Sequence, residues 1–252
     1  MKKLFAAAAL AALGMGPALA ADLPPKAPPP YRPPPPPVVA PYNWTGFYLG
    51  ANGGWGFGTK CWTFLGSVVG GPVPPVKEGC HDPSGGLVGG QVGANYQINQ
   101  NWVVGLEAQG DWANLKASNV SVPFPTFTNR TRIDALGLLT GRVGFAWDAT
   151  LLYVKGGAAL AHDKYDYFLT AAPNPPTGTA SETRWGYTVG AGVEFGFAQN
   201  WSLAVEYDWV DLGKKNVTFA SPTQTIDQIR EGIHLVTGRI NYRFGGPVSA
   251  RY

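Results

Sequence analysis

The segment 101–112 carries two carboxylates, Glu107 and Asp111, at a spacing that places both on one face of an extended strand. Paired carboxylates are the groups that general acid–base catalysis uses, so this face is a first candidate for chemistry. The alternate positions are mostly apolar, with Trp102 at one end and Trp112 at the other. A strand with acids on one face and large apolar side chains on the other requires two very different environments.

Histidines and nucleophiles offer little further chemistry. The chain has three histidines, His81, His162 and His234. A Ser-His-Asp hydrolase needs a serine within hydrogen-bond reach of a histidine and an acid behind it. Ser181 and Ser221 fall in segments that could approach a histidine, but no motif places them there. We therefore expect no enzyme, no catalytic residue and no cofactor.

The first residues have the pattern of a secretory signal peptide. Lys2 and Lys3 precede an apolar stretch that ends in small residues, so we expect a signal peptide at 1–20, cleaved after Ala20. The formal net charge of +3 includes these two lysines. The mature chain is therefore close to neutral, which gives no electrostatic case for nucleic-acid binding.

Residues 21–42 are dominated by proline. Proline fixes φ and lacks an N–H, so we expect a stiff polyproline II segment that acts as a periplasmic spacer. The alternative is a tether that contacts peptidoglycan or a proline-binding partner, with Lys26 and Arg32 assisting.

The alternation seen in 101–112 recurs along residues 43–244. The segments are 44–58, 87–98, 101–112, 132–147, 151–161, 184–197, 201–212 and 234–244. Each is about as long as a tilted strand that crosses a bilayer, and we find no run of about eighteen apolar residues in the mature chain. An even number of such strands in an exported chain predicts a closed barrel, because lipid tolerates no unpaired sheet edge. The expected fold is all-β, an eight-stranded antiparallel transmembrane β-barrel.

The connections between these segments orient the barrel. They are short after the second, fourth and sixth segments and long after the others, at 58–84, 114–130, 163–183 and 213–231. Short periplasmic turns and four long extracellular loops are typical of an outer-membrane barrel with a periplasmic N-terminus. Tryptophans then fall at the two membrane interfaces. The predicted girdles are Trp44, Trp102, Trp147 and Trp201 on the periplasmic side, and Trp55, Trp112, Trp185 and Trp209 on the outer side.

The two cysteines, Cys61 and Cys80, lie in the first long connection. An exported protein meets an oxidising compartment, which favours a disulfide between them. A metal site with His81 is the alternative, but these three ligands lack a fourth. We predict the disulfide and no metal site.

The inward faces carry six acids and six bases. The predicted lumen charge network is Glu107, Asp111, Asp134, Glu194, Glu206 and Asp208 with Arg132, Arg142, Lys155, Arg184, Arg239 and Arg243. Buried charges persist when they are paired, and adjacent-strand pairs suggest Glu107 with Arg142, Lys155 with Glu194, and Glu206 with Arg239. Eight strands enclose room for side chains but no broad channel. Inward glycines keep a narrow water path open as the alternative to a sealed lumen.

The segment from Tyr42 to Gly58, the two Gln-Asn-Trp turns and the closing "GRINYRF" resemble the small outer-membrane immunogenic proteins of alphaproteobacteria. This porin-like family is related to opacity-type and OmpA-type barrels. The resemblance covers 42–244 and includes an aromatic assembly signal, Ile240, Tyr242 and Phe244, followed here by an extension at 245–252. No peptidoglycan-binding domain follows the barrel, so a wall-anchoring role is not carried over.

The resemblance implies a structural barrel in the outer membrane of a Gram-negative bacterium, with roles in envelope integrity and surface display as an antigen or adhesin. A narrow porin for small hydrophilic solutes is the alternative, and a lipid-modifying barrel enzyme is a further one. The implied partners are outer-membrane lipids, lipopolysaccharide and the outer-membrane assembly machinery. Contact of the proline-rich segment with peptidoglycan stays open.

Overall fold

The structure is a computed structural model that describes residues 42–172 and 175–244. The signal peptide expected at 1–20, the proline-rich segment at 21–42 apart from Tyr42, and the extension at 245–252 lie outside the described residues. No helix in the described part of the chain is long and apolar enough to cross a membrane.

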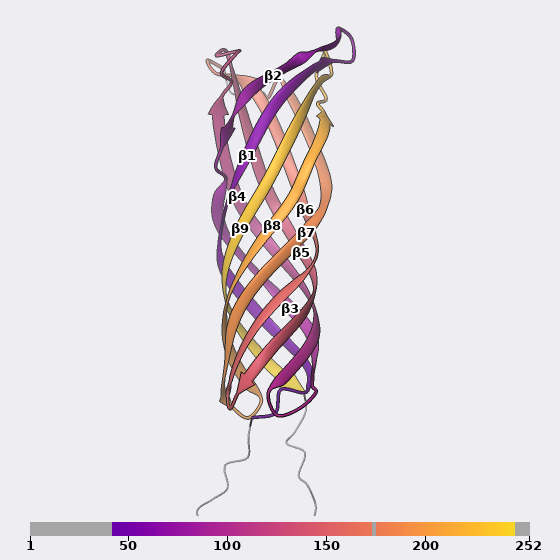
Figure 1. Ribbon diagram of the computed structural model, residues 1–252. Helices are drawn as coiled ribbons and strands as arrows, with labels where there is room; N and C mark the ends of the chain where they lie inside the picture. Colours follow the sequence, from indigo (N-terminus) through magenta and orange to yellow (C-terminus); the bar gives the residue numbers. More distant parts are fainter. Residues whose placement is uncertain (1–41, 173–174, 245–252) are drawn as a thin grey trace, which may run out of the picture. The chain divides into compact units, whose positions relative to one another are not determined.

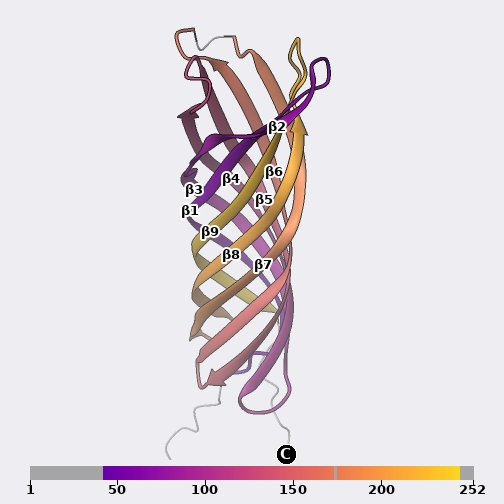
Figure 2. The ribbon, with the colours of Figure 1, turned by 45° about the horizontal axis from the view of Figure 1, so that its top comes forward.

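Nine strands form one closed antiparallel sheet within the described residues (Figures 1 and 2). They are β1 (Gly46–Ser67), β2 (Gly71–His81), β3 (Ser84–Gln97), β4 (Trp102–Val120), β5 (Phe127–Trp147), β6 (Thr150–Leu169), β7 (Gly178–Ala198), β8 (Trp201–Thr218) and β9 (Thr225–Phe244). From β3 to β9 each strand pairs with the next, and β1 pairs with both β3 and β9. The β1–β9 pairing closes the sheet into a barrel, which removes the free edges of an open sheet.

β2 and β3 together make one wall of this barrel. β1 pairs with β3 over residues 46–57 and with β2 over residues 60–67. The interruption between them falls at Pro83, which has no N–H to donate to the ladder, although its carbonyl accepts from the Gly58 amide at 2.9 Å. The predicted antiparallel outer-membrane-type barrel is confirmed, and the additional strand is the returning half of the first predicted loop.

Seven of the nine strands in the described residues are about twice as long as a membrane crossing requires. β4, β5 and β9 contain 19, 21 and 20 residues, whereas a tilted transmembrane strand needs about 9–11. The prediction of four long loops is therefore corrected, because most of these residues continue the wall as strand. The corrected segments are 58–84, 114–130, 163–183 and 213–231. We call the wall beyond Trp55, Trp112, Trp185 and Trp209 the crown.

The pattern of outward apolar residues that predicts membrane strands does not extend into the crown, because the apolar side chains of the crown point inward. Trp62 and Tyr165, for example, are fully buried inside it. The register shift between Trp112 and Leu115 in β4 helps to make this change, and β5 has a similar shift at the same height. One extra residue in a strand reverses which of the following side chains face the interior.

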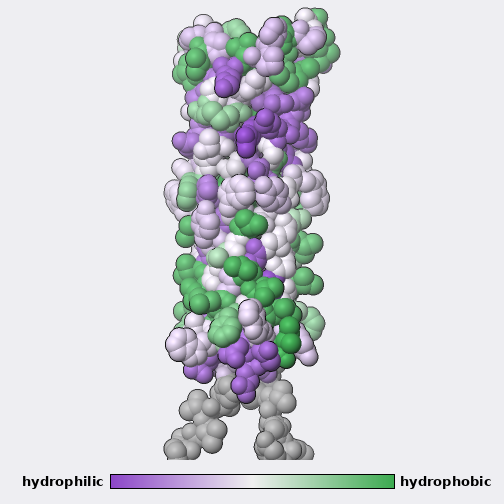
Figure 3. Space-filling view, viewed as in Figure 1, coloured by the Kyte–Doolittle hydropathy of each residue, from purple (hydrophilic) through white to green (hydrophobic). Residues whose placement is uncertain are grey.

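Below the crown, the outward face of the barrel is an apolar band. Figure 3 shows one side of this band, with hydrophobic side chains below a more hydrophilic upper part. Tryptophans that are clearly exposed lie at both ends of the band, and Trp112 is 76% exposed. They are Trp102, Trp147 and Trp201 near the short turns, and Trp55, Trp112 and Trp185 at the start of the crown. Trp209 is partly covered by the ring of Tyr187.

Trp44 departs from the predicted girdle and is corrected here. It is 0% exposed and packs inside the barrel against Val103, Leu151 and Tyr153. Its indole N–H donates to the Asp148 carbonyl at 3.3 Å. Trp44 precedes the first strand, so the alternation of strand residues does not determine which way its side chain points.

Candidate functional site

The inward residues of β9 pass through every layer of the lumen, from the short-turn end to the crown. In that order they are Arg243, Asn241, Arg239, Thr237, Leu235, Ile233, Glu231, Ile229 and Asp227, all buried. Polar and apolar layers therefore alternate along the barrel axis. Two of the polar layers contain ion pairs, and we take the lower one as the candidate functional site.

The lower layer is a ring of four charges from four strands. The Lys155 ammonium group lies 2.6 Å from Glu206 and 3.3 Å from Glu107. The Arg239 guanidinium group contacts the same two carboxylates, with 2.8 Å to Glu107. All four side chains are shielded from solvent. Each cation is shared by both acids, so the ring connects β4, β6, β8 and β9 across the lumen.

Two tyrosines complete the hydrogen bonding of the glutamates. The Tyr48 hydroxyl donates to Glu107 at 2.7 Å, and the Tyr153 hydroxyl donates to Glu206 at 2.6 Å. In both cases one strand lies between the tyrosine and the glutamate, and that strand has a glycine at the position that pairs with both residues. The glycine is Gly93 for Tyr48 and Glu107, and Gly192 for Tyr153 and Glu206. A Cβ at either glycine would collide with the tyrosine hydroxyl. The barrel thus uses the same Tyr–Gly–Glu arrangement twice.

Arg142 and Glu194 extend the ring toward the short-turn end. The Arg142 guanidinium group lies 3.4 Å from Glu194 and 3.8 Å from Glu107. It also lies over the rings of Tyr48 and Tyr153, at 4.7 and 5.1 Å from their centroids. Such cation–π contacts add to the stabilisation of a desolvated guanidinium group.

The short-turn end of the lumen is closed by Trp44 and Arg243. The Arg243 guanidinium group lies 4.6 Å from the centre of the Trp44 ring and donates to the Asn43 carbonyl at 2.8 Å. It also lies 3.8 Å from Glu194, which joins this floor to the charge ring.

Above the ring, an apolar layer separates it from a second charged layer. Leu136, Leu138, Leu235 and Ile233 belong to the apolar layer. The second charged layer is Lys60 with Asp163 at 2.7 Å and Glu231 at 3.0 Å, and Arg184 with Glu231 at 3.4 Å.

Most of the predicted lumen charges do face the interior. Asp111 and Asp208 are buried next to the ring, and Asp208 lies 3.4 Å from Lys155. Two of the three suggested pairs are present in the structure, Glu107 with Arg142 and Glu206 with Arg239. The third suggestion is corrected, because Lys155 pairs with Glu107, Glu206 and Asp208, whereas Glu194 pairs with Arg142.

Arg132 and Asp134 do not belong to the lumen, which corrects that part of the prediction. Their side chains are 49% and 21% exposed and pair with each other on the outside of the barrel, at 2.5 Å. Asp134 occupies the register shift between Ile133 and Ala135. The extra residue reverses the alternation, so Ile133 faces the interior in place of its neighbours.

Sequence reasoning missed Lys60, Asp163 and Glu231, which lie in segments predicted as loops. Their signal in the sequence is an ionisable residue between inward apolar positions, such as Glu231 between Ile229 and Ile233. This signal is visible once the crown is known to be strand.

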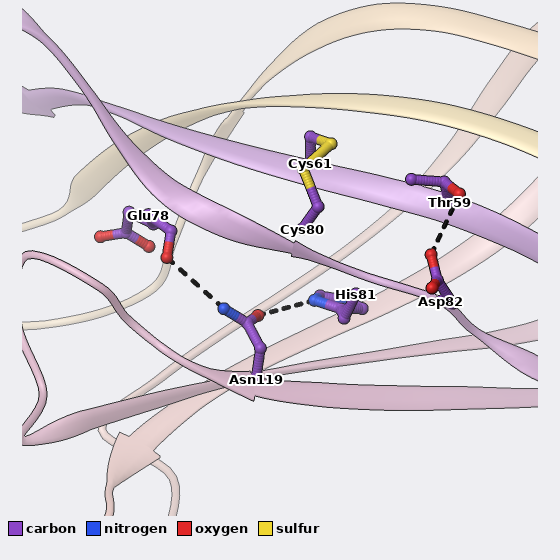
Figure 4. The surroundings of a disulfide bond; sticks show 7 residues. All are labelled: Thr59, Cys61, Glu78, Cys80, His81, Asp82 and Asn119. Atoms are coloured by element: carbon purple, nitrogen blue, oxygen red, sulfur yellow. Dashed lines mark hydrogen bonds between the residues drawn. A yellow bond between two sulfur atoms is a disulfide. The ribbon is translucent and has the colours of Figure 1, made fainter.

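Cys61 and Cys80 are joined by a disulfide between directly paired positions of β1 and β2 (Figure 4). Next to it, His81 contacts Asn119 at 2.7 Å and Thr131 at 2.9 Å. Burial lowers the pKa of His81, which favours the neutral imidazole. No cluster of three or more potential metal-binding side chains is present in the described residues.

His162 and Ser181 lie together on the outside of the crown. The Ser181 hydroxyl is 3.3 Å from Nε2 of His162, and Nδ1 of the same ring faces the Thr183 hydroxyl at 3.2 Å. A hydrolytic triad would have a carboxylate or another orienting group at Nδ1 that stabilises the imidazolium ion. A threonine hydroxyl carries no charge for this purpose.

Basic side chains gather on the outside of the crown, just beyond Trp112. This basic patch, defined as Lys116, Arg130, Arg132 and Lys164, lines a hollow of about 700 Å³ on the outer wall. Cross-strand pairing aligns Lys116, Arg132 and Lys164 on β4, β5 and β6. Asp134, Asp166 and Glu182 are its acidic neighbours. The patch retains an excess of positive charge.

Comparison with known proteins identifies the family. The model of the outer membrane protein beta-barrel domain matches residues 5–244. The chain belongs to this family. The 31 kDa outer-membrane immunogenic protein of Brucella melitensis biotype 1 is 28% identical over 244 residues, which cover 94% of this chain and 98% of that protein. The 22 kDa outer membrane protein of Rhizobium leguminosarum bv. viciae is 30% identical over 174 residues, which cover 69% and 67%.

The protein is therefore an outer-membrane barrel, and its apolar band fits this location. The resemblance to outer-membrane immunogenic proteins is confirmed. Among solved structures, OprG from Pseudomonas aeruginosa aligns over 81% of this chain and 99% of its own, at 10% identity and a TM-score of 0.46. Neisserial surface protein A aligns over 79% and 98%, at 15% identity and a TM-score of 0.38.

Proposed function

We propose that this outer-membrane barrel is a sealed structural protein that contributes to envelope integrity and displays its crown at the cell surface. The observation that carries the proposal is the shared ion-pair ring of Glu107, Glu206, Lys155 and Arg239, which fills the lumen with buried side chains. A broad aqueous path would leave these groups hydrated. Apolar layers above and below the ring support the same function.

A planar-bilayer recording separates this function from the alternative, a narrow porin. The sealed barrel predicts no stepwise conductance when the purified, heat-modifiable protein is reconstituted. Steps that change in size when Glu107 or Arg142 is replaced would overturn the sealed barrel in favour of the porin.

The display role places the crown outside the cell and the short turns in the periplasm. Protease added to intact cells should then cleave in the crown, near residues 68–70 or 221–224, where the described turns are exposed. Cleavage only after the outer membrane is permeabilised would contradict this orientation.

We propose that the basic patch contacts lipopolysaccharide. Lys116 lies four residues beyond Trp112 on β4, so the patch lies just outside the interface at which tryptophan rings settle. Lysine and arginine are the side chains that bind anionic headgroups there. Replacing Lys116 and Arg132 by glutamine should reduce co-purified lipopolysaccharide. An unchanged ratio of lipopolysaccharide to protein would contradict the contact.

We propose that the end of the closing strand, β9, is the signal that the outer-membrane assembly machinery recognises. Ile240, Tyr242 and Phe244 all face outward at the end of β9, where an assembly machine in the membrane can reach them. Their replacement by serine should reduce insertion in cells without altering the lumen. Contact between the proline-rich segment and peptidoglycan is proposed from the sequence alone.

We also propose that the barrel has no enzymatic activity. Ser181 and His162 are the strongest hydrolytic candidates, and Thr183 stands where an acid would be needed. His162→Ala should leave the composition of the outer-membrane lipids unchanged. A change in lipid composition that is lost with this variant would contradict the proposal.

A further inference from the structure

The mouth of the crown contains a second cavity, distinct from the basic patch and from the charge ring. Its volume is about 380 Å³, which is within the range of small-molecule sites. The lining comes from β1, β2, β5, β6 and β9 and from turns of the crown, and it includes Phe64, Glu78, Phe124, Phe127, Tyr167 and Asp227. We call this cavity the mouth pocket.

Aromatic rings form much of the wall of the mouth pocket. Phe64 of β1 and Phe124 meet edge to face at 5.9 Å, and so do Phe127 of β5 and Tyr167 of β6. The edge-to-face contacts fix the orientation of these rings. The pocket therefore presents fixed aromatic surfaces to whatever enters the mouth.

The floor of the mouth pocket is closed by the buried layer below it. Trp62, Phe219 and Ile229 pack together there and are fully buried. Tyr167 in the wall packs against Phe219 at 5.4 Å, which joins the pocket to this floor. A ligand in the pocket would therefore be held at the mouth and would not pass into the lumen.

Two acids line the pocket, and they differ in their bonding. Glu78 of β2 accepts a hydrogen bond from the Asn129 amide at 2.7 Å. Asp227 of β9 is 4% exposed, and its Oδ1 is buried without a hydrogen-bond partner. No basic side chain in the described residues forms an ion pair with either acid. A buried carboxylate without a counter-charge is costly, so a positively charged ligand in the pocket would stabilise these acids.

We propose that the mouth pocket is a binding site for a small organic cation with an apolar body, such as a substituted ammonium ion. The cation would lie against Asp227 and Glu78, and its apolar part would contact Phe64, Phe127 and Tyr167. Aromatic faces attract ammonium groups, and a desolvated carboxylate strengthens this attraction. An anionic ligand is disfavoured by both acids.

The surroundings favour an organic cation over a hard metal ion. Calcium takes six to eight oxygen ligands, and magnesium about six. The mouth pocket supplies two carboxylates in a wall that is largely aromatic. Burial and the neighbouring Glu78 raise the pKa of Asp227 to about 8, so a bound cation competes with a proton for this carboxylate and should bind more tightly above that pH.

The test is a titration of the full chain at pH 9, where Asp227 is ionised, in polyoxyethylene detergent micelles, which contain neither ammonium groups nor sugars. The probe is benzyltrimethylammonium, whose charge does not change with pH, and protein NMR signals report binding. Neopentylbenzene has the same shape without the charge. We expect saturable shifts for the cation, and at least about tenfold weaker binding of the uncharged compound.

Variants locate the binding. Asp227→Asn and Glu78→Gln keep the side-chain size and should each weaken binding of the cation about tenfold. Asp166→Asn is the matched control, because Asp166 is an acid on the outside of the crown and should leave binding unchanged. Heat-modifiable migration on gels confirms that each variant is folded. Equal affinity for the cation in Asp227→Asn and the wild type would overturn the proposal. Displacement of the cation by maltotriose, to the same extent in both proteins, would also overturn it.

Discussion

The ammonium group of Lys155 lies 2.6 Å from Oε1 of Glu206, although β6 and β8 are separated by β7 in the sheet. The contact is made on the lumen side of β7, over the backbone of Gly190 and Gly192. Glu107 reaches the same ammonium group from β4. A single side chain thus connects three strands that do not pair with one another, which ties the middle of the barrel into one unit.

Replacement of Lys155 by methionine should destabilise the barrel strongly. Methionine fills a similar volume but leaves Glu107 and Glu206 with less positive charge, and breaking a buried ion pair on one side costs about 3–5 kcal/mol. The expected result is a lower urea midpoint, measured by tryptophan fluorescence and by heat-modifiable migration. Lys164→Met, which removes an exposed cation, should have little effect. Equal losses in the two variants would contradict the role of the ring.

Gly192→Ala should destabilise the barrel by steric conflict with Tyr153. The added Cβ would lie 2.5 Å from the Tyr153 hydroxyl, and overpacking of this kind costs about 1–3 kcal/mol. The Cβ would also lie 2.6 Å from Cζ of that ring, and Tyr153→Leu removes both atoms, so the double variant should lose less stability than the sum of the two single variants. Urea unfolding of all four proteins gives the coupling energy. Strict additivity would show that the tyrosine does not need the glycine.

The disulfide should stabilise the hairpin of β1 and β2 and leave the lumen unchanged. Cys61 and Cys80 close a loop of 19 residues, for which chain entropy gives about 3 kcal/mol. Replacing both cysteines by serine should accelerate protease cleavage near residues 68–70. The gel migration of the heated and unheated barrel should stay the same. Loss of barrel formation in this variant would show that β2 is required for closure.

Stability should depend on pH through Asp227. Its pKa is 3.8 in an ordinary carboxyl and about 8 in the crown, because of burial and of Glu78 on β2. The folded state therefore favours the protonated form, so the contribution of Asp227 to stability falls as pH rises from about 4 to about 8. The phenol of Tyr167 also faces the pocket, and no base pairs with Asp227 in the described residues.

Asp227→Asn should remove part of this dependence, because burial also raises the pKa of Glu231 in the crown, to about 7. Urea midpoints at pH 5, 7 and 9 should fall less in the variant than in the wild type, and Asp166→Asn should behave like the wild type. A wild-type midpoint that rises across this range with no change in Asp227→Asn would contradict the assignment.

The sequence determines the membrane part of the fold because a single physical rule applies there. Lipid on one side and a polar lumen on the other produce strict alternation, as in Trp102 to Trp112. The rule fails in the crown, where water replaces lipid outside. Asp134 shows the difficulty, because a register shift of one residue moves it and Arg132 to the outside. Contacts that pass over an intervening strand, such as Tyr153 to Glu206, depend on the register of three strands.

The ring of charges also bears on how the barrel closes. Arg239 belongs to β9, which follows the other strands in the described part of the chain, and it contacts both glutamates of the ring. Before β9 lies against β1, Glu107 and Glu206 have only Lys155 and Arg142 as cationic partners among the described residues. Closure therefore forms the hydrogen bonds between the edge strands β1 and β9 and, in the same step, brings Arg239 to the two glutamates of the ring. A barrel that lacks β9 would carry an open edge and excess negative charge together, so assembly is driven toward completion by the strand that closes it.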